Sequence, residues 1–177
     1  VGTLHTEQEI KTEITVPEYL LGACTRALTA AHPYEEPVWN MIPLENVNPV
    51  TGFGIIGELP QAEEPRPFLE RVKATFGCGC LRHTALCKGE IRKVAVCGGA
   101  GAFLTQAAIR AGADVFISAD YKYHDFFDAD KRLIIADIGH YESEQFTKEI
   151  FYELVRKKIP NFAIRFSELS TNPVNYL

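Results

Sequence analysis

The sequence predicts an α/β protein with a mainly parallel sheet that is covered by helices, preceded by a β-α-β unit. Strand-like and helix-like segments alternate along most of the chain, which is typical of this fold class. The segments VAV, DVFI and LIIA are nearly continuous in apolar residues, as expected for strands that are buried on both faces. Helical connections between such strands predict parallel pairing with right-handed crossovers.

The N-terminal part predicts the β-α-β unit. Residues 9–16 alternate between apolar and polar side chains, which predicts a strand. A helix is expected over residues 18–32, because Pro17 suits its start and Pro33 ends it. Residues 37–44 are rich in β-forming residues and predict a second strand.

A turn-rich connection at residues 45–52 predicts a domain boundary. It divides the chain into residues 1–52 and 53–177. The second part opens with a short apolar stretch and a polar loop over residues 60–67. The elements expected after that loop are a helix at 66–76, strands at 81–86 and 93–99, a helix at 102–113, a strand at 114–119, a loop or short helix at 120–131, a strand at 132–137, a long helix at 139–159 and a strand at 162–166.

Composition narrows the classes of function. The 177 residues are 46% hydrophobic, enough for a sizeable core. The net charge is -5, and Lys and Arg form no basic stripe, so no nucleic-acid partner is expected. No apolar run approaches the ~20 residues that a membrane span needs. The N-terminus does not resemble a signal peptide, and the odd number of five cysteines fits a reducing cytoplasm.

The strongest candidate site is the sequence GHYESE at residues 139–144. It follows a buried strand, and ligands of open α/β sheets gather beyond the carboxyl ends of the strands. His140 and Glu144 are four residues apart, so they share one face of a helix. An imidazole nitrogen and a carboxylate can bind a divalent cation together. The alternative is a hydrogen-bonded surface pair, and two ligands alone do not complete a site.

A second candidate is DYKYHD at residues 120–125, which follows another buried strand. Asp120 and Lys122 are candidates for contact with a ligand, and His124 is a candidate general acid or base. The alternative is a solvated loop without chemistry.

Three further segments have weaker patterns. CGGAGAF at residues 97–103 is either an anion site or a tight turn between strand and helix. The Cys and His residues of CGCLRHTALC match no common zinc spacing, so free thiols are the better interpretation. AHPYEEP at residues 31–37 contains His32, Glu35 and Glu36, and a rigid turn is favoured there over a metal site.

Several segments together resemble one family, the GTP cyclohydrolase 1 type 2 homologues, also called dinuclear-metal-centre proteins. They are AHPYEEPVWNMIPLEN, GFGIIGEL, VAVCGGAGAF, GADVFISADYKYHD, DIGHYESE and STNPVNYL, in this order. The resemblance implies an α/β core made of two related halves, with residues 53–177 as the second half. Residues 9–44 resemble half of an inserted PII/CutA-like, ferredoxin-like domain.

The resemblance also implies a pair of divalent metal ions per full-length protomer. His140 and Glu144 match the G-H-x-x-x-E motif that supplies the C-terminal ligands. The N-terminal ligands of the family are a His-His pair and an Asp, and this chain has no His-His. Ser118-Ala119-Asp120 stands where relatives often have Thr-Gly-Asp. Zinc is the first expectation for mixed N and O ligands, with Fe, Mn, Co and Ni as alternatives. The family further implies a toroidal homohexamer.

Two functions are consistent with this sequence. The first is a metal-dependent hydrolase, in which two ions activate a water and hold a phosphate or carbonyl oxygen. The second is a non-catalytic metal-binding or regulatory assembly that responds to a small-molecule ligand.

Overall fold

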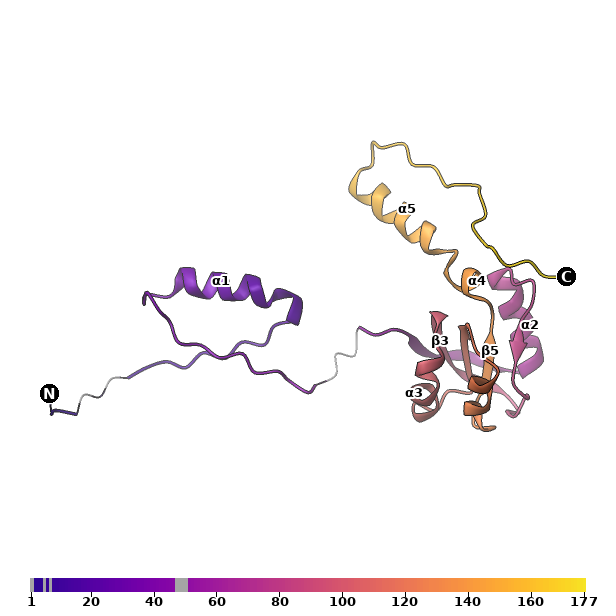
Figure 1. Ribbon diagram of the computed structural model, residues 1–177, viewed down its shortest axis with the longest axis horizontal. Helices are drawn as coiled ribbons and strands as arrows, with labels where there is room; N and C mark the ends of the chain where they lie inside the picture. The colour runs from indigo at the N-terminus through magenta and orange to yellow at the C-terminus, as the bar shows by residue number, and fades with distance from the viewer. Residues whose placement is uncertain (1, 5, 7, 47–50) are drawn as a thin grey trace. The chain divides into compact units, whose positions relative to one another are not determined.

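The computed structural model describes the chain except for residues 1, 5, 7 and 47–50 (Figure 1). Residue contacts divide it into two units, Val1–Val47 and Asn48–Leu177. The sequence prediction set the boundary at residues 52 and 53. That the two parts are half of an inserted domain and half of a core stays a prediction.

The described residues of the first unit form one helical segment. The 3-10 turn η1 (Glu18–Leu20) leads into helix α1 (Leu21–Ala31), which confirms the predicted helix. The strands expected at residues 9–16 and 37–44 are wrong, because the described part of this unit contains no strand. A strand needs a neighbour for its backbone hydrogen bonds, and these segments pair with nothing in the described residues.

The second unit is built on a five-stranded sheet in the order β1-β3-β4-β5-β2. Its strands are β1 (Ile55–Glu63), β2 (Arg82–His83), β3 (Ile91–Ala100), β4 (Val115–Ala119) and β5 (Ile134–Asp137). The three central strands are parallel, but both edge strands pair antiparallel. The sheet is therefore mixed, which corrects the expectation of a mainly parallel one.

Strand β1 also corrects the loop predicted at residues 60–67. The strand continues through Pro60 to Glu63. Proline donates no backbone hydrogen bond, so it is tolerated at an edge or a bulge. Strand β1 is an edge strand, and its register with β3 shifts between Glu58 and Glu63.

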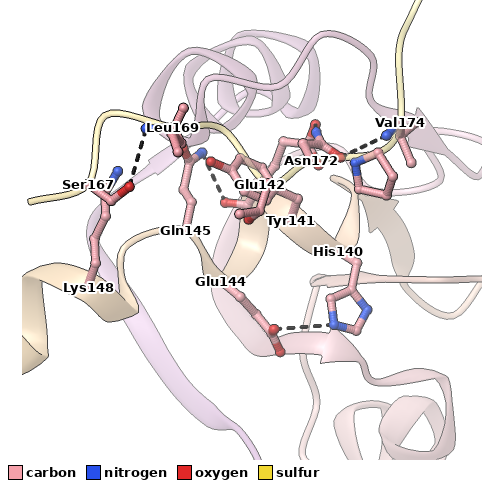
Figure 2. Close-up of a pocket in the computed structure, with 12 residues that line it drawn as sticks. His140, Tyr141, Glu142, Glu144, Gln145, Lys148, Ser167, Leu169, Asn172 and Val174 are labelled. Atoms are coloured by element: carbon pink, nitrogen blue, oxygen red, sulfur yellow. Dashed lines mark hydrogen bonds and ion pairs between the residues drawn. The ribbon is translucent and has the colours of Figure 1, made fainter.

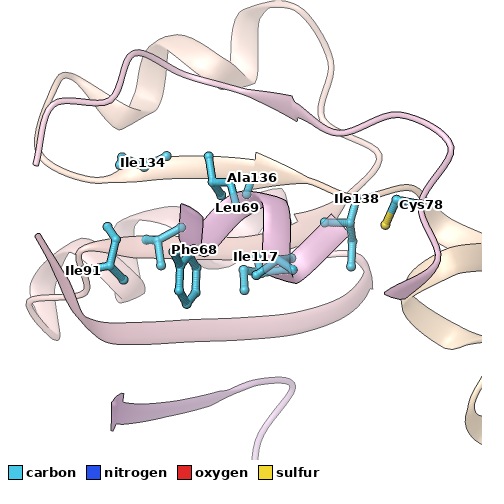
Figure 3. Close-up of a cluster of buried hydrophobic side chains, with 10 residues drawn as sticks. Phe68, Leu69, Cys78, Ile91, Ile117, Ile134, Ala136 and Ile138 are labelled. Atoms are coloured by element: carbon cyan, nitrogen blue, oxygen red, sulfur yellow. The ribbon is translucent and has the colours of Figure 1, made fainter. Parts of the chain in front are cut away.

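Helices cover both faces of the sheet, as the sequence predicts. Helix α2 (Pro65–Phe76) buries Phe68, Leu69 and Val72 against one face (Figure 3). The opposite face is covered by helix α3 (Thr105–Arg110), which follows the turn η2 (Ala102–Leu104), and by η3 (His124–Ala129). Residues of β4 and β5 alternate between the two cores, as the pleat of a strand requires.

The long helix expected at residues 139–159 is broken into α4 (His140–Glu144) and α5 (Thr147–Lys158). The break is fixed by contacts with the end of α2. Gln145 donates a 2.8 Å hydrogen bond to the carbonyl of Phe76, and the Phe146 ring packs edge-on against the Phe76 ring.

The strand expected at residues 162–166 is also wrong, since no strand is formed there. Phe166 instead stacks on Tyr152 of α5, with ring centroids 4.7 Å apart. The segment thus lies against the helix rather than the sheet, and the chain then returns toward α4 (Figure 1). None of the helices in the described residues is both long and apolar enough to cross a membrane.

Candidate metal centre

The structure brings His140 and Glu144 together at the carboxyl end of β5. Gly139 has a positive φ of 90° and turns the chain from the strand into α4. One turn of this helix then sets His140 Nε2 3.2 Å from an Oε2 oxygen of Glu144 (Figure 2). Both side chains are about half exposed, so they are accessible to an ion from solvent.

Asp120 joins this pair from the neighbouring strand. It follows β4 and has a left-handed φ of 56°. Its Oδ2 lies 2.6 Å from His140 Nδ1. This hydrogen bond is the main reason that the pKa of His140 lies above its ordinary value. The contact also fixes the ring orientation, in the way that carboxylates orient histidines beside metals.

The two other candidates of the same loop lie apart from this pair. Lys122 is exposed, and its backbone N–H donates to Asp125 Oδ2. His124 is exposed at the start of η3 and packs edge-on against Tyr123. In the described residues, neither side chain forms a hydrogen bond or ion pair with His140 or Glu144. Their proposed roles stay predictions.

The glycine run after β3 lies directly beside the pair and acts as a packing turn. The Gly99 N–H donates to Ser143 Oγ at 2.8 Å, so it is already used within the fold. Gly99 has a φ of 64°, and a Cβ there would stand 2.5 Å from a Glu144 oxygen. The close approach of strand and helix therefore requires glycine here, which favours the tight-turn interpretation over an anion site.

Sequence reasoning missed two buried carboxylates near the pair. Asp137 is 4% exposed and accepts hydrogen bonds from the backbone N–H groups of Tyr121 and Gly139 and from Arg82. It ties the loop after β4 to the end of β5. The available signal was an acidic residue at the end of a fully apolar strand.

The second missed residue is Glu142, which is 5% exposed. Asn172 Nδ2 donates to its carboxylate at 3.3 Å, and the Tyr176 hydroxyl lies near it, since a Cβ at Gly139 would meet both groups. Both partners belong to the C-terminal segment, so no local sequence pattern could have identified this role.

A pocket of about 520 Å³ opens beside the pair (Figure 2). One side is formed by α4 and Lys148, and the other by residues of the C-terminal segment. The lining residues are His140, Tyr141, Glu142, Glu144, Gln145, Lys148, Ser167, Leu169, Thr171, Asn172, Pro173 and Val174.

The weaker candidate segments form no further metal centre. All five cysteines are free thiols, and burial raises the pKa of Cys78 to about 11. His32 Nδ1 accepts the N–H of Tyr34, which fits a turn. The described residues contain no cluster of three or more His, Cys, Asp or Glu side chains arranged to hold a metal.

Comparison with known proteins identifies related chains. The family model of Duf34/NIF3 (NGG1p interacting factor 3) matches residues 4–173. A Staphylococcus epidermidis protein named GTP cyclohydrolase 1 type 2 homolog is 38% identical over 173 residues, which cover 95% of this chain and 47% of the relative. A Halalkalibacterium halodurans protein of the same name is 33% identical over 180 residues, covering 99% of this chain and 48% of the relative.

Two solved structures share the fold of this chain. A Bacillus cereus protein related to NIF3 superposes with a TM-score of 0.69 at 33% identity, over 92% of this chain and 46% of that one. A Staphylococcus aureus protein superposes with a TM-score of 0.72 at 24% identity, over 94% and 55% of the two chains. The chain spans about half the length of the relatives that it matches.

Proposed function

This chain belongs to the Duf34/NIF3 family, and from this premise we propose that His140 and Glu144 bind a divalent metal ion as part of a dinuclear hydrolase centre. Relatives carry the name GTP cyclohydrolase 1 type 2 homolog. The proposed reaction class for the whole protein is therefore metal-dependent hydrolysis.

The observation that carries the proposal is the distance between the two donor atoms. Two ligands of a tetrahedral zinc ion, each bound at 2.0–2.2 Å, stand about 3.4 Å apart. His140 Nε2 and the Glu144 oxygen are 3.2 Å apart, so both fit one ion with little movement.

Asp120 supports the same assignment. It occupies His140 Nδ1, which leaves Nε2 as the nitrogen that faces Glu144. A histidine that binds metal usually donates its other ring N–H to a carboxylate or carbonyl, and losing that partner costs roughly 10–100-fold in metal affinity. In this proposal Asp120 is a positioning residue rather than a ligand.

The proposed centre needs further ligands from outside the described residues. A catalytic zinc takes three protein ligands and an open position, and His140 with Glu144 supplies two. In the family that the sequence resembles, a His-His pair and an Asp from an N-terminal half complete two metal sites. Zinc is our first choice for the ion, with Fe, Mn, Co and Ni as alternatives.

The chemistry that such ions supply is polarisation of a phosphoryl or carbonyl oxygen. The residues of this chain would hold the ions, orient His140 through Asp120 and keep strand and helix close at Gly99. His124 is retained as the proposed acid or base. In full-length form we expect the protein to self-associate as a homohexamer, which light scattering after size-exclusion chromatography would test.

The test is a zinc titration of the 177-residue chain by isothermal calorimetry. His140→Ala and Glu144→Gln should each lower zinc affinity at least about tenfold, and Asp120→Asn should lower it in the same range. His83→Ala is the matched control, because His83 is exposed on β2 and its ring, among the described residues, hydrogen-bonds to the adjacent Thr84 carbonyl and not to the pair. Unchanged affinity in both ligand variants would refute the assignment.

A second experiment separates the hydrolase from a non-catalytic assembly. The full-length protein, after elemental analysis, is screened against phosphate esters, cyclic amides and nucleotides, with and without His140→Ala. Turnover that requires metal and disappears in the variant supports the hydrolase. Stoichiometric metal without any turnover favours the non-catalytic role.

A further inference from the structure

The pocket beside His140 and Glu144 has the size of a ligand site. Its volume of about 520 Å³ lies within the roughly 300–1,000 Å³ that small-molecule sites occupy. Resting on the proposed metal binding, we propose that it binds a small organic anion, with the acidic group between the bound ion and Lys148 and an apolar body against the C-terminal segment.

The C-terminal wall of this pocket is attached to the core at a defined point. Asn172 donates a hydrogen bond to the buried carboxylate of Glu142, and the Tyr176 hydroxyl lies near the same carboxylate, since a Cβ at Gly139 would meet both groups. The Tyr176 ring also lies so close to Gly79 that a Cβ there would meet the ring at 2.6 Å. A buried carboxylate needs such partners to offset its desolvation, so the segment is held beside α4 by more than surface contact.

The wall contributes apolar side chains to the lining of the pocket. Pro173 and Val174 follow Asn172 directly, and Leu169 lies on the same segment. Figure 2 shows Leu169 and Val174 along this segment. Leu169 is 83% exposed and Val174 54% exposed, so both retain surface that a ligand can cover. Burial of this apolar surface by a ligand would favour binding.

Metal lowers the negative charge around the pocket and therefore favours binding of an anion. The lining contains Glu142, Glu144 and Lys148, and Asp120 contacts His140, so these four side chains carry two net negative charges without metal. A divalent cation at His140 and Glu144 would bring this balance to zero. In the described residues Lys148 forms no ion pair, so its ammonium group is available to an anion.

The test compares phenylphosphonate with methylphosphonate, which share the acidic group and differ in the apolar body. Binding to the 177-residue chain is measured by calorimetry with saturating zinc and again with EDTA. We expect phenylphosphonate to bind the zinc form at least about tenfold more tightly than methylphosphonate, and neither compound to bind the EDTA-treated form.

Three variants, one of them a control, test these contacts. Lys148→Met should weaken both phosphonates about tenfold, whereas Lys157→Met, a charge loss of the same kind in the last turn of α5, should weaken neither. Val174→Ser should weaken phenylphosphonate alone. Zinc affinity should not change in any of the three, because none of these residues is a proposed ligand.

The outcomes separate this inference from the metal assignment. If zinc binds through His140 and Glu144 but phenylphosphonate binding is absent, or is insensitive to Lys148 and Val174, the ligand pocket is wrong and the metal site stands. If zinc itself does not bind, the proposed function fails and this inference fails with it.

Discussion

Two segments of this chain have strand-like sequences but end in different structures. Residues 9–16 alternate between apolar and charged side chains, yet they form no strand, and Ile10 is 93% exposed. Strand β5 (Ile134–Asp137) lies between β4 and β2, and all four of its residues are buried. The comparison shows that a pattern supplies a preference, whereas neighbouring strands and covering helices supply the structure.

The largest expected change in stability is found by truncating one isoleucine in each segment and comparing the two losses. Ile134→Ala removes a side chain with 0% exposure and should lower the free energy of unfolding by about 3–4 kcal/mol, through lost burial and a cavity. Ile10→Ala should change it by less than about 0.5 kcal/mol. Urea unfolding followed by circular dichroism measures both. A loss above about 1 kcal/mol in Ile10→Ala would mean that residues 9–16 are packed in solution.

The next prediction compares the loss of stability on changing two acidic residues, one in each unit. Asp137→Ala leaves the buried N–H of Tyr121 without its partner and removes the ion pair with Arg82. We expect a loss of about 2–3 kcal/mol, because removing one member of a buried polar network is costly.

The matched change is Glu13→Gln in the first unit. Glu13 pairs with Lys11 at 2.5 Å, but both side chains are more than three-quarters exposed. Such pairs are screened by water and contribute little, so no change in urea unfolding is expected. Equal losses in the two acidic variants would contradict the contrast between the units.

Most of the second unit was predictable because its signals are local. Helix α2 has Phe68, Leu69 and Val72 at helical spacing, Pro65 in its first turn and Gly77 in the left-handed conformation after its end. These features act within a few residues of one another. The sequence could therefore specify this helix without knowledge of its neighbours.

The features that the sequence could not predict depend on distant contacts. The break before α5 depends on Gln145 reaching the carbonyl of Phe76, 69 residues away. The segment at 162–166 has a strand-like composition, but Phe166 stacks on Tyr152 instead. No spacing rule along the chain contains either contact.

In the candidate site, too, local contacts could be predicted from the sequence and contacts between distant residues could not. The convergence of His140 and Glu144 follows from their spacing in one helical turn. The contact of Asp120 with His140 requires β4 and β5 to be neighbours. The contact of Glu142 with Asn172 joins residues 30 positions apart, with α5 between them, and lay beyond any local pattern.

A smaller effect on stability tests the glycine beside the pair. Gly99→Ala places a Cβ 2.5 Å from a Glu144 oxygen at a φ of 64°. We expect a loss of about 1–2 kcal/mol from the left-handed backbone, together with weaker zinc binding because the carboxylate is displaced. Gly112→Ala is the control, since Gly112 has a φ of 74° and open space around its Cβ position. It should lose similar stability and keep its zinc affinity, and equal zinc affinity in both variants would remove Gly99 from the site.

The last prediction compares the alkylation rates of two cysteines in the native protein, with no residue substituted. Cys78 is buried, and burial raises its pKa to about 11, so about one thiol in 1,000 is ionised at pH 8. Cys24 is partly exposed on α1. Because the thiolate is the nucleophile, iodoacetamide at pH 8 should label Cys24 at least about tenfold faster, as read by mass spectrometry of peptides. In urea the two rates should converge, because unfolding removes the burial that raises the pKa of Cys78. Equal rates in the native protein would instead mean that the region around Cys78 opens as readily as the first unit.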